Sequence, residues 1–271
     1  MIRSCLIVLS LLCAAPVFSG VPVTGRHQHM FFSRAAVQVV AAKAYHKEVA
    51  RLARHDELDN NQQILHRVRH LCSHLIAQAI RLKPVAASWP WEVHITSDPE
   101  VAAYSMGGGK LMVGTHFISS YKLSNDELAV ALAHEIGHVI AEHVREQVSV
   151  AARFNTSVPL RTRKVADVIN AMQSDISVFL RLQPLSRLQE MEADDIGIEL
   201  AARAGIPPAA VISFYSKIAQ GDEGQSIFNT HGSPAQRVKF IDSMANYAEP
   251  VYEASRGVKL LPNYAFADAE Q

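Results

Sequence analysis

The sequence has little charge and no excess of either sign. Lys and Arg number 26, Asp and Glu also number 26, and 19% of the residues are charged, whereas 49% are apolar. This composition excludes an intrinsically disordered chain. Because the net charge is zero, nothing global attracts the chain to nucleic acid or to an anionic membrane. We therefore expect no nucleic-acid partner.

Cysteine is scarce, and no apolar segment is long. The three cysteines are Cys5, Cys13 and Cys72. The most apolar run, Cys5–Phe18, follows Arg3 and is shorter than the roughly 20 residues that a spanning helix needs. We interpret residues 1–19 as a signal peptide that is cleaved near Ser19. Cys72 is then the only cysteine of the mature chain, which excludes an internal disulfide, and we expect a buried thiol.

The rest of the chain lacks repeats, low-complexity tracts and linkers, which predicts a single domain over residues 20–271. Two segments have helical periodicity and two have strand character, in this order: 32–55, 61–83, 91–96 and 110–114. After residue 124 the pattern is mostly helical. The predicted fold class is α+β, mostly helical, with a small sheet.

Three histidines at four-residue spacing invite a metal-site interpretation: His66, His70 and His74. On a helix they fall opposite the apolar face, beside Arg67, which is typical of a solvated surface. We expect no metal there.

The segment SNDELAVALAHEIGHVIAEHVR carries the chemistry. Ser124 and Glu127 have the spacing of a capping box and predict the start of a long helix. His134 and His138 lie one turn apart on the same face, so both imidazoles can bind one Zn²⁺. Glu135 lies about 100° around the helix from His134. It can act as the general base for an attacking water.

Three later residues of this segment are expected to play lesser parts: Glu142, His143 and Glu146. On a continuous helix His143 is turned about 180° from His134, so it cannot join the same metal site. We interpret it as a packing or hydrogen-bonding residue, and the two glutamates as charges on the helix surface.

A third ligand is available in SRLQEMEADDIGIELAARAG, a second predicted helix. Glu190 and Asp194 stand four residues apart on one face, while Glu192 points elsewhere. Glu190 can complete a set of two histidines and one glutamate and leave a fourth position to water. Asp194 can hold a ligand histidine by its second ring nitrogen. An ordinary acidic helix face is the alternative.

HEIGH followed by ExxAD at Glu190–Asp194 resembles the HtpX-like and CAAX-prenyl-endopeptidase-like zinc metalloproteases, which are gluzincins. The similarity covers residues 91–242. It implies a metallopeptidase domain with N-terminal helices at 31–83 and a catalytic core at 91–242, in which the edge strand of a small sheet borders the zinc cleft. The exported periplasmic members, which the chain resembles in size, act in outer-membrane protein quality control.

Two further segments support the resemblance, VAAYSMGGGKLMVGTHFI and THGSPAQR. In the second, His231 is a candidate catalytic residue that stabilises the tetrahedral intermediate. By similarity it can instead keep the enzyme latent, and a structural loop histidine is the remaining alternative. Arg237 is expected to be a structural hydrogen-bonding residue. Three positions depart from the family pattern and leave loop geometry less certain: Ala102, Gly107 and Gly232.

The expected function is a zinc-dependent endopeptidase with one Zn²⁺ per chain. Its expected substrates are unfolded or misassembled cell-envelope polypeptides, outer-membrane proteins among them. Residues 110–115, as an exposed sheet edge, would pair with an extended polypeptide. Residues 149–184 are long enough to form a lid over the cleft.

The expected location is the periplasm, with peripheral membrane association allowed; an uncleaved anchor, lipid attachment and a eukaryotic secretory location are the alternatives. The main alternative function is a non-catalytic, chaperone-like binding module for unfolded envelope proteins. A purely structural zinc site needs no general base, so Glu135 favours the enzyme. A membrane-spanning prenyl-protein protease is disfavoured because no later apolar run approaches spanning length.

Overall fold

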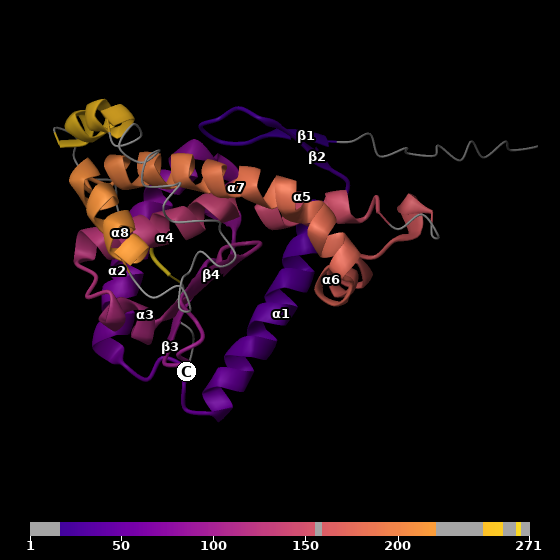
Figure 1. The fold of residues 1–271 in the computed structure, drawn as a ribbon, viewed down its shortest axis with the longest axis horizontal. Coiled ribbons are helices and arrows are strands. Elements are labelled where there is room, and N and C mark those ends of the chain that lie inside the picture. The colour runs from indigo at the N-terminus through magenta and orange to yellow at the C-terminus, as the bar shows by residue number, and fades with distance from the viewer. Residues whose placement is uncertain (1–16, 155–158, 221–245, 257–263, 267–271) are drawn as a thin grey trace, which may run out of the picture.

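The computed structural model describes residues 17–154, 159–220, 246–256 and 264–266. Helices dominate, and a small sheet is inserted between the second and third of them (Figure 1). In Figure 1, α2, α3 and α8 gather at one end of the molecule and α1 and α6 at the other, while α7 runs between the two ends. The predicted α+β, mostly helical class is confirmed.

The two N-terminal helices agree closely with the sequence periodicity. Helix α1 spans Arg34–Arg54 and α2 spans Gln62–Leu82. The side chains of Ser33 and Asn61 each accept a hydrogen bond from a backbone N–H in the first turn of the helix that follows. Such caps fix where a helix begins, because the first N–H groups have no partner within the helix. A short 3₁₀ helix, η1, follows α2 at Pro84–Ser88.

The α2 surface behaves as expected. Cys72 is a fully buried free cysteine. His66 and His70 are exposed and His74 is half-buried, with the rings of neighbouring histidines in contact. The interpretation of the histidine row as helix surface is confirmed.

The main sheet has three strands, β3 (Glu92–Thr96), β4 (Ala103–Met106) and β5 (Lys110–Gly114). Their order is β3-β5-β4, with β5 parallel to β3 and antiparallel to β4. The expectation that residues 110–115 form the sheet edge is therefore wrong. Strand β5 is central and buried along its whole length.

Strands β3 and β4 both lie beside β5, at the two edges of the sheet. The sequence analysis missed β4. Its residues AYSM lack the alternation of apolar and polar side chains that marks a strand. The chain returns from β4 to β5 through Gly107–Gly109, where Gly108 and Gly109 have positive φ angles of 86° and 84°. Glycine adopts this conformation without steric penalty. Strand β4 contacts α4, the helix of the candidate site. The edge strand beside the site is therefore formed by residues 103–106 and not by residues 110–115.

Two helices hold the HExxH and ExxAD segments. Helix α4 spans Asn125–Ile140 and begins with the predicted capping box, in which Glu127 Oε2 accepts from Ser124 N at 2.7 Å. Burial would raise the pKa of Glu127, but hydrogen bonds from Lys217, Ser213 and Ser124 lower it to about 2. Helix α7 spans Ile176–Arg203 and begins well before the predicted start, with Pro184 inside it.

Shorter elements complete the described fold. Helix α3 (Thr115–Ser120) follows β5, and α5 (His143–Ala151), η2 (Leu160–Thr162) and α6 (Val165–Ser174) connect α4 to α7. The predicted lid segment 149–184 contains the end of α5, η2, α6 and the first turns of α7, and α6 contacts α1, α5 and α7. Helix α8 (Pro208–Gln220) contacts both α4 and α7. In the part of the chain that the structure describes, no helix is both long and apolar enough to cross a membrane.

The N-terminal part of the described chain forms a hairpin. Strands β1 (Val17–Gly20) and β2 (His27–Met30) pair antiparallel. The predicted signal peptide falls mostly outside the described residues. Cleavage after Ser19 would cut β1 and leave β2 and the loop before it in the mature chain.

Helices α4 and α7 approach each other at two glycines. A Cβ atom added to Gly197 would lie 2.9 Å from both Cα and N of His134. One added to Gly137 would lie 2.9 Å from the carbonyl oxygen of Ala193. Carbon atoms in proteins normally approach no closer than roughly 3.5 Å. Any side chain at either position would therefore push the two helices apart.

We predict that Gly197→Ala lowers the free energy of unfolding by about 1–3 kcal/mol through overpacking. The loss is expected even though alanine favours a helix over glycine by roughly 1 kcal/mol. Urea unfolding measures it. Gly107→Ala is the control, because its added Cβ meets only ordinary contacts at 3.7 Å. Equal stability of the two variants would contradict the close approach.

Candidate metal centre

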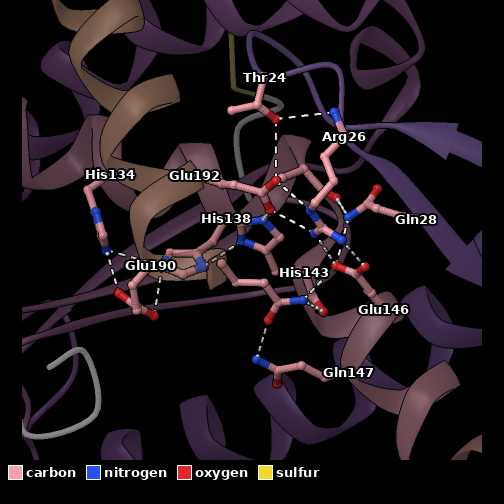
Figure 2. A network of polar contacts seen from close by, with 12 residues as sticks. Thr24, Arg26, Gln28, His134, His138, His143, Glu146, Gln147, Glu190 and Glu192 are labelled. Atoms are coloured by element: carbon pink, nitrogen blue, oxygen red, sulfur yellow. Dashed lines mark hydrogen bonds and ion pairs between the residues drawn. The ribbon is translucent and has the colours of Figure 1, made fainter. Parts of the chain in front are cut away.

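Three side chains from α4 and α7 meet in a buried cluster, His134, His138 and Glu190 (Figure 2). Their donor atoms all lie within 4.8 Å of one another. The two Nε2 atoms are 3.1 Å apart, and each lies 3.4 Å from a different oxygen of Glu190. The three residues predicted as ligands are thus brought together.

These distances fit a tetrahedral metal ion. Ligand atoms at about 2.0–2.1 Å from a tetrahedral Zn²⁺ stand about 3.3–3.4 Å apart. The two Nε2 atoms, at 3.1 Å, and each Nε2 with its nearer Glu190 oxygen, at 3.4 Å, stand close to that spacing. Two imidazoles and one carboxylate also form the donor set of catalytic zinc sites, in which a fourth position stays open to water.

Asp194 holds the first histidine as predicted. Its Oδ1 lies 2.9 Å from His134 Nδ1 and accepts a second hydrogen bond from the hydroxyl of Tyr215 at 2.6 Å. With Nδ1–H donating to Asp194, Nε2 is the nitrogen of His134 that is left for a metal ion, and it faces Glu190. Sequence reasoning missed Tyr215, which lies on α8 and carries no motif.

Negative charge dominates the cluster. Burial alone would lower the pKa of His134, but hydrogen bonds to Asp194 and Glu190 outweigh it and raise the pKa to about 9. The same carboxylates favour any cation placed between the three side chains.

The role predicted for His143, packing or hydrogen bonding, is confirmed, but the position predicted from a continuous helix is wrong. Helix α4 ends at Ile140, Glu142 adopts a left-handed φ of 58°, and α5 begins at His143 in a new direction. This break turns the ring of His143 back toward the site, and its Nδ1 lies 2.9 Å from His138 Nδ1. Its Nε2 lies 3.3 Å from Glu192 Oε2. Burial lowers the pKa of His143 to about 4, so the ring is neutral at pH 7.

The expectation that Glu142 is a surface charge is also wrong. It is 7% exposed, and Arg34, Lys83 and Arg145 contact its carboxylate at 2.7–3.0 Å. Burial would raise its pKa, but the hydrogen bond from Arg34 and the other two cations lower it to about 2. The sequence around Glu142 could not predict these partners, because Arg34 and Lys83 lie far from it in the sequence.

Glu146 is likewise buried, at 3% exposure, and its carboxylate binds Arg26 through two hydrogen bonds of 2.6 and 2.7 Å. The amides of Gln28 and Gln189 also donate to it. The sequence analysis singled out none of these three partners.

Glu135, the proposed base, lies in the described part of the chain, whereas His231 does not. Glu135 is 3% exposed and follows His134 on α4, and its role as the general base stays a prediction. His231, Pro234 and Arg237 lie outside the described residues. Their roles stay predictions.

A cavity that is partly open to solvent adjoins the cluster at His138. Its walls come from α1, from the end of β4 with the following glycine turn, and from the junction of α4 and α5. Six polar or charged side chains, including those of Arg34, Glu142 and Arg145, line it together with five apolar ones, although most of the wall surface that they expose is apolar. The lining residues include Val37, Trp89, Met106, Val139, Glu142 and Val144.

An HExxH helix that faces a glutamate on a second helix is the arrangement of a metal-dependent hydrolase. Comparison with known families gives the particular class, because residues 60–245 match Peptidase family M48. The chain belongs to that family. The resemblance based on HEIGH and ExxAD is confirmed.

Three relatives illustrate the range of similarity. The mitochondrial metalloendopeptidase OMA1 of Arabidopsis thaliana is 34% identical over 172 residues, 62% of this chain and 34% of that protein. The metalloprotease LoiP of Escherichia coli is 27% identical over 157 residues, 56% of this chain and 60% of that protein. The β-barrel assembly-enhancing protease of E. coli is 25% identical over 178 residues, 60% of this chain and 36% of that protein. The chain matches less than two thirds of the length of each.

We predict that Asp194→Asn weakens Zn²⁺ binding about 10–100-fold, the usual effect of losing a carboxylate that orients a ligand histidine. Competition with a chromophoric chelator measures the affinity. The neighbouring Asp195→Asn is the matched control, because Asp195 is half-buried and has no recorded contact with the three ligands in the described residues. Equal affinities of the two variants would remove Asp194 from the site.

Proposed function

We propose that this protein is a zinc-dependent endopeptidase that cleaves unfolded or misassembled polypeptides. The observation that carries the proposal is the convergence of His134, His138 and Glu190, the donor set of a catalytic zinc site, at a helix that also carries the buried Glu135. Membership in Peptidase family M48 supports the reaction class. Because the chain spans about a third to three fifths of the three relatives described, its own activity needs a direct test.

His134, His138 and Glu190 would hold one Zn²⁺. Bound there, zinc polarises the scissile carbonyl and lowers the pKa of water from 15.7 toward about 7. Glu135 accepts a proton from the attacking water on its carboxylate and delivers that proton to the nitrogen of the leaving amine. The C–O bond forms as the water attacks, and the C–N bond breaks as the amine leaves. We retain His231 as the candidate donor to the negatively charged oxygen of the intermediate.

Strand β4 offers a way to bind substrate by its main chain. One side of β4 pairs with β5, and its opposite side is a sheet edge. Residues 104–106 are half-buried, so the strand is partly open to solvent. An extended polypeptide added at this edge would be recognised by conformation more than by sequence. This mode favours unfolded or misassembled chains over folded ones.

The setting we propose is the cell envelope. We propose that the chain is exported after cleavage near Ser19 and acts in the periplasm. Its substrates there would include outer-membrane proteins, and it would contact the membrane peripherally. Two of the relatives are E. coli proteases, one of them named for β-barrel assembly. The OMA1 relatives are mitochondrial, so similarity alone does not choose the compartment.

We predict that Glu135→Gln keeps zinc but lowers kcat/KM on unfolded casein about 10²–10⁴-fold, the typical contribution of a general base. Asp126→Asn, on the first turn of the same helix, is the control and should retain activity. Zinc content is measured in parallel. A parent protein that holds zinc and binds casein without cleaving it would replace the proposal with the chaperone-like alternative.

The cavity beside His138 generates a second prediction, about side-chain preference. We expect it to take an apolar substrate side chain near the scissile bond, because most of its exposed wall surface is apolar. Met106→Ala enlarges it and should shift cleavage toward larger side chains, since one methylene changes such discrimination about 10–200-fold.

Mass spectrometry of casein fragments maps the cleavage sites. Met191→Ala is the matched control, because Met191 is 50% exposed on α7 and does not line the cavity. An unchanged cleavage pattern in Met106→Ala would show that substrate side chains bind elsewhere.

A further inference from the structure

A loop near the N-terminus reaches the site through one arginine. Arg26 lies between β1 and β2 and binds two buried glutamates at once (Figure 2). Its Nη1 and Nη2 donate to Glu146, and its Nε and Nη2 donate to Glu192 at 2.6 and 2.7 Å. Glu146 lies on α5 and Glu192 on α7, so one guanidinium joins the loop to both helices.

Glu192 continues toward the metal site. Its Oε1 accepts from Arg26 Nε and, at 3.3 Å, from the hydroxyl of Thr24. Its Oε2 accepts from Arg26 Nη2 and faces His143 Nε2 at 3.3 Å. The planar fork of Arg26 therefore fixes the carboxylate plane with one oxygen aimed at His143.

The proton positions along this chain of contacts follow from donor and acceptor roles. A carboxylate only accepts, so His143 Nε2 carries the proton that faces Glu192. In the neutral ring, His143 Nδ1 is then an acceptor, and it must receive the Nδ1–H of His138 at 2.9 Å. His138 consequently turns the lone pair of its Nε2 toward His134 and Glu190, as a metal ligand requires.

We infer that Arg26 is a positioning residue of the metal centre, which holds His138 in its ligand tautomer and orientation through Glu192 and His143. The inference rests on the proposed zinc site. Arg26 lies outside residues 60–245, the part of the chain that matches the family. The N-terminal loop thus supports the second ligand histidine, as Asp194 supports the first.

The loop is built to hold this arginine in place. Val21 is 2% exposed, and backbone hydrogen bonds of 2.9 Å join Val21 N to Arg26 O and Gly25 N to Val21 O. The whole loop follows Ser19, so the predicted removal of residues 1–19 would leave the contacts of Arg26 intact. The contacts to Glu146 and Glu192 span 120 and 166 residues of sequence.

The first test is the zinc affinity of the full chain, measured by chelator competition. Arg26→Gln should bind Zn²⁺ about 10–100-fold more weakly than the parent. Arg203→Gln is the matched control, because Arg203 also pairs with a buried glutamate of α7, Glu199, but has no recorded link to a ligand in the described residues. Affinity equal to that of the parent in Arg26→Gln would overturn the inference.

A double-mutant cycle separates positioning from a general loss of stability. If Arg26 acts through His143, zinc affinity in Arg26→Gln/His143→Phe should match that of His143→Phe alone, because the relay is already cut. Losses that add fully would show that Arg26 acts by another route and would overturn the inference.

A third measurement needs no variant. Because coupling is reciprocal, zinc must stabilise the docked loop as much as the loop stabilises zinc. Amide hydrogen exchange over residues 21–30 should slow on adding Zn²⁺, and equal exchange with and without bound zinc would contradict the relay. A parent that binds no zinc would refute the proposed function and this inference together. A parent that binds zinc and cleaves casein, with Arg26→Gln unchanged, would refute only the inference.

Discussion

The metal centre depends on the close approach of α4 and α7. Gly137 and Gly197 let the two backbones come near enough that an added Cβ would collide with the opposite helix. This contact places the two histidines of α4 opposite Glu190 and Asp194 of α7. Because the spacing of the ligand atoms follows from the spacing of two rigid helices, the site is shaped before any metal binds. Preorganisation of this kind keeps ligands near productive geometry.

Three further buried glutamates near the site are held by ion pairs. Glu142, Glu146 and Glu192 are each less than 9% exposed, and each contacts at least one arginine. A buried carboxylate is tolerated when it is paired and hydrogen-bonded, and it is costly otherwise. Glu146 and Glu192 are paired where the N-terminal loop, α5 and α7 meet, and Glu142 is paired with cations of α1, of α5 and of the segment after α2. The elements that enclose the site are therefore joined by ion pairs in addition to apolar contacts.

Local patterns in the sequence were enough to predict α1, α2, the start of α4, two strands and the three candidate ligands. Each of these rests on periodicity or on spacing within one element, as with His134 and His138 at one helical turn. The errors arose where structure depends on distant partners. Strand β4 lacks an alternating pattern and forms because it can pair with β5. Glu142 and Glu146 have a surface-like local pattern, and only partners from remote segments reveal them as buried.

The break after α4 shows how such partners shape the site. A left-handed conformation at a non-glycine residue costs of order 1–3 kcal/mol, so Glu142 adopts it only because its surroundings hold it there. Arg34, Lys83 and Arg145 supply that hold by binding the Glu142 carboxylate. A helix that continued straight would carry His143 to the face opposite His134. The ion pairs of Glu142 therefore stabilise the turn that brings His143 against His138. Glu142, which the sequence suggested to be a surface charge, thus helps to support the metal centre.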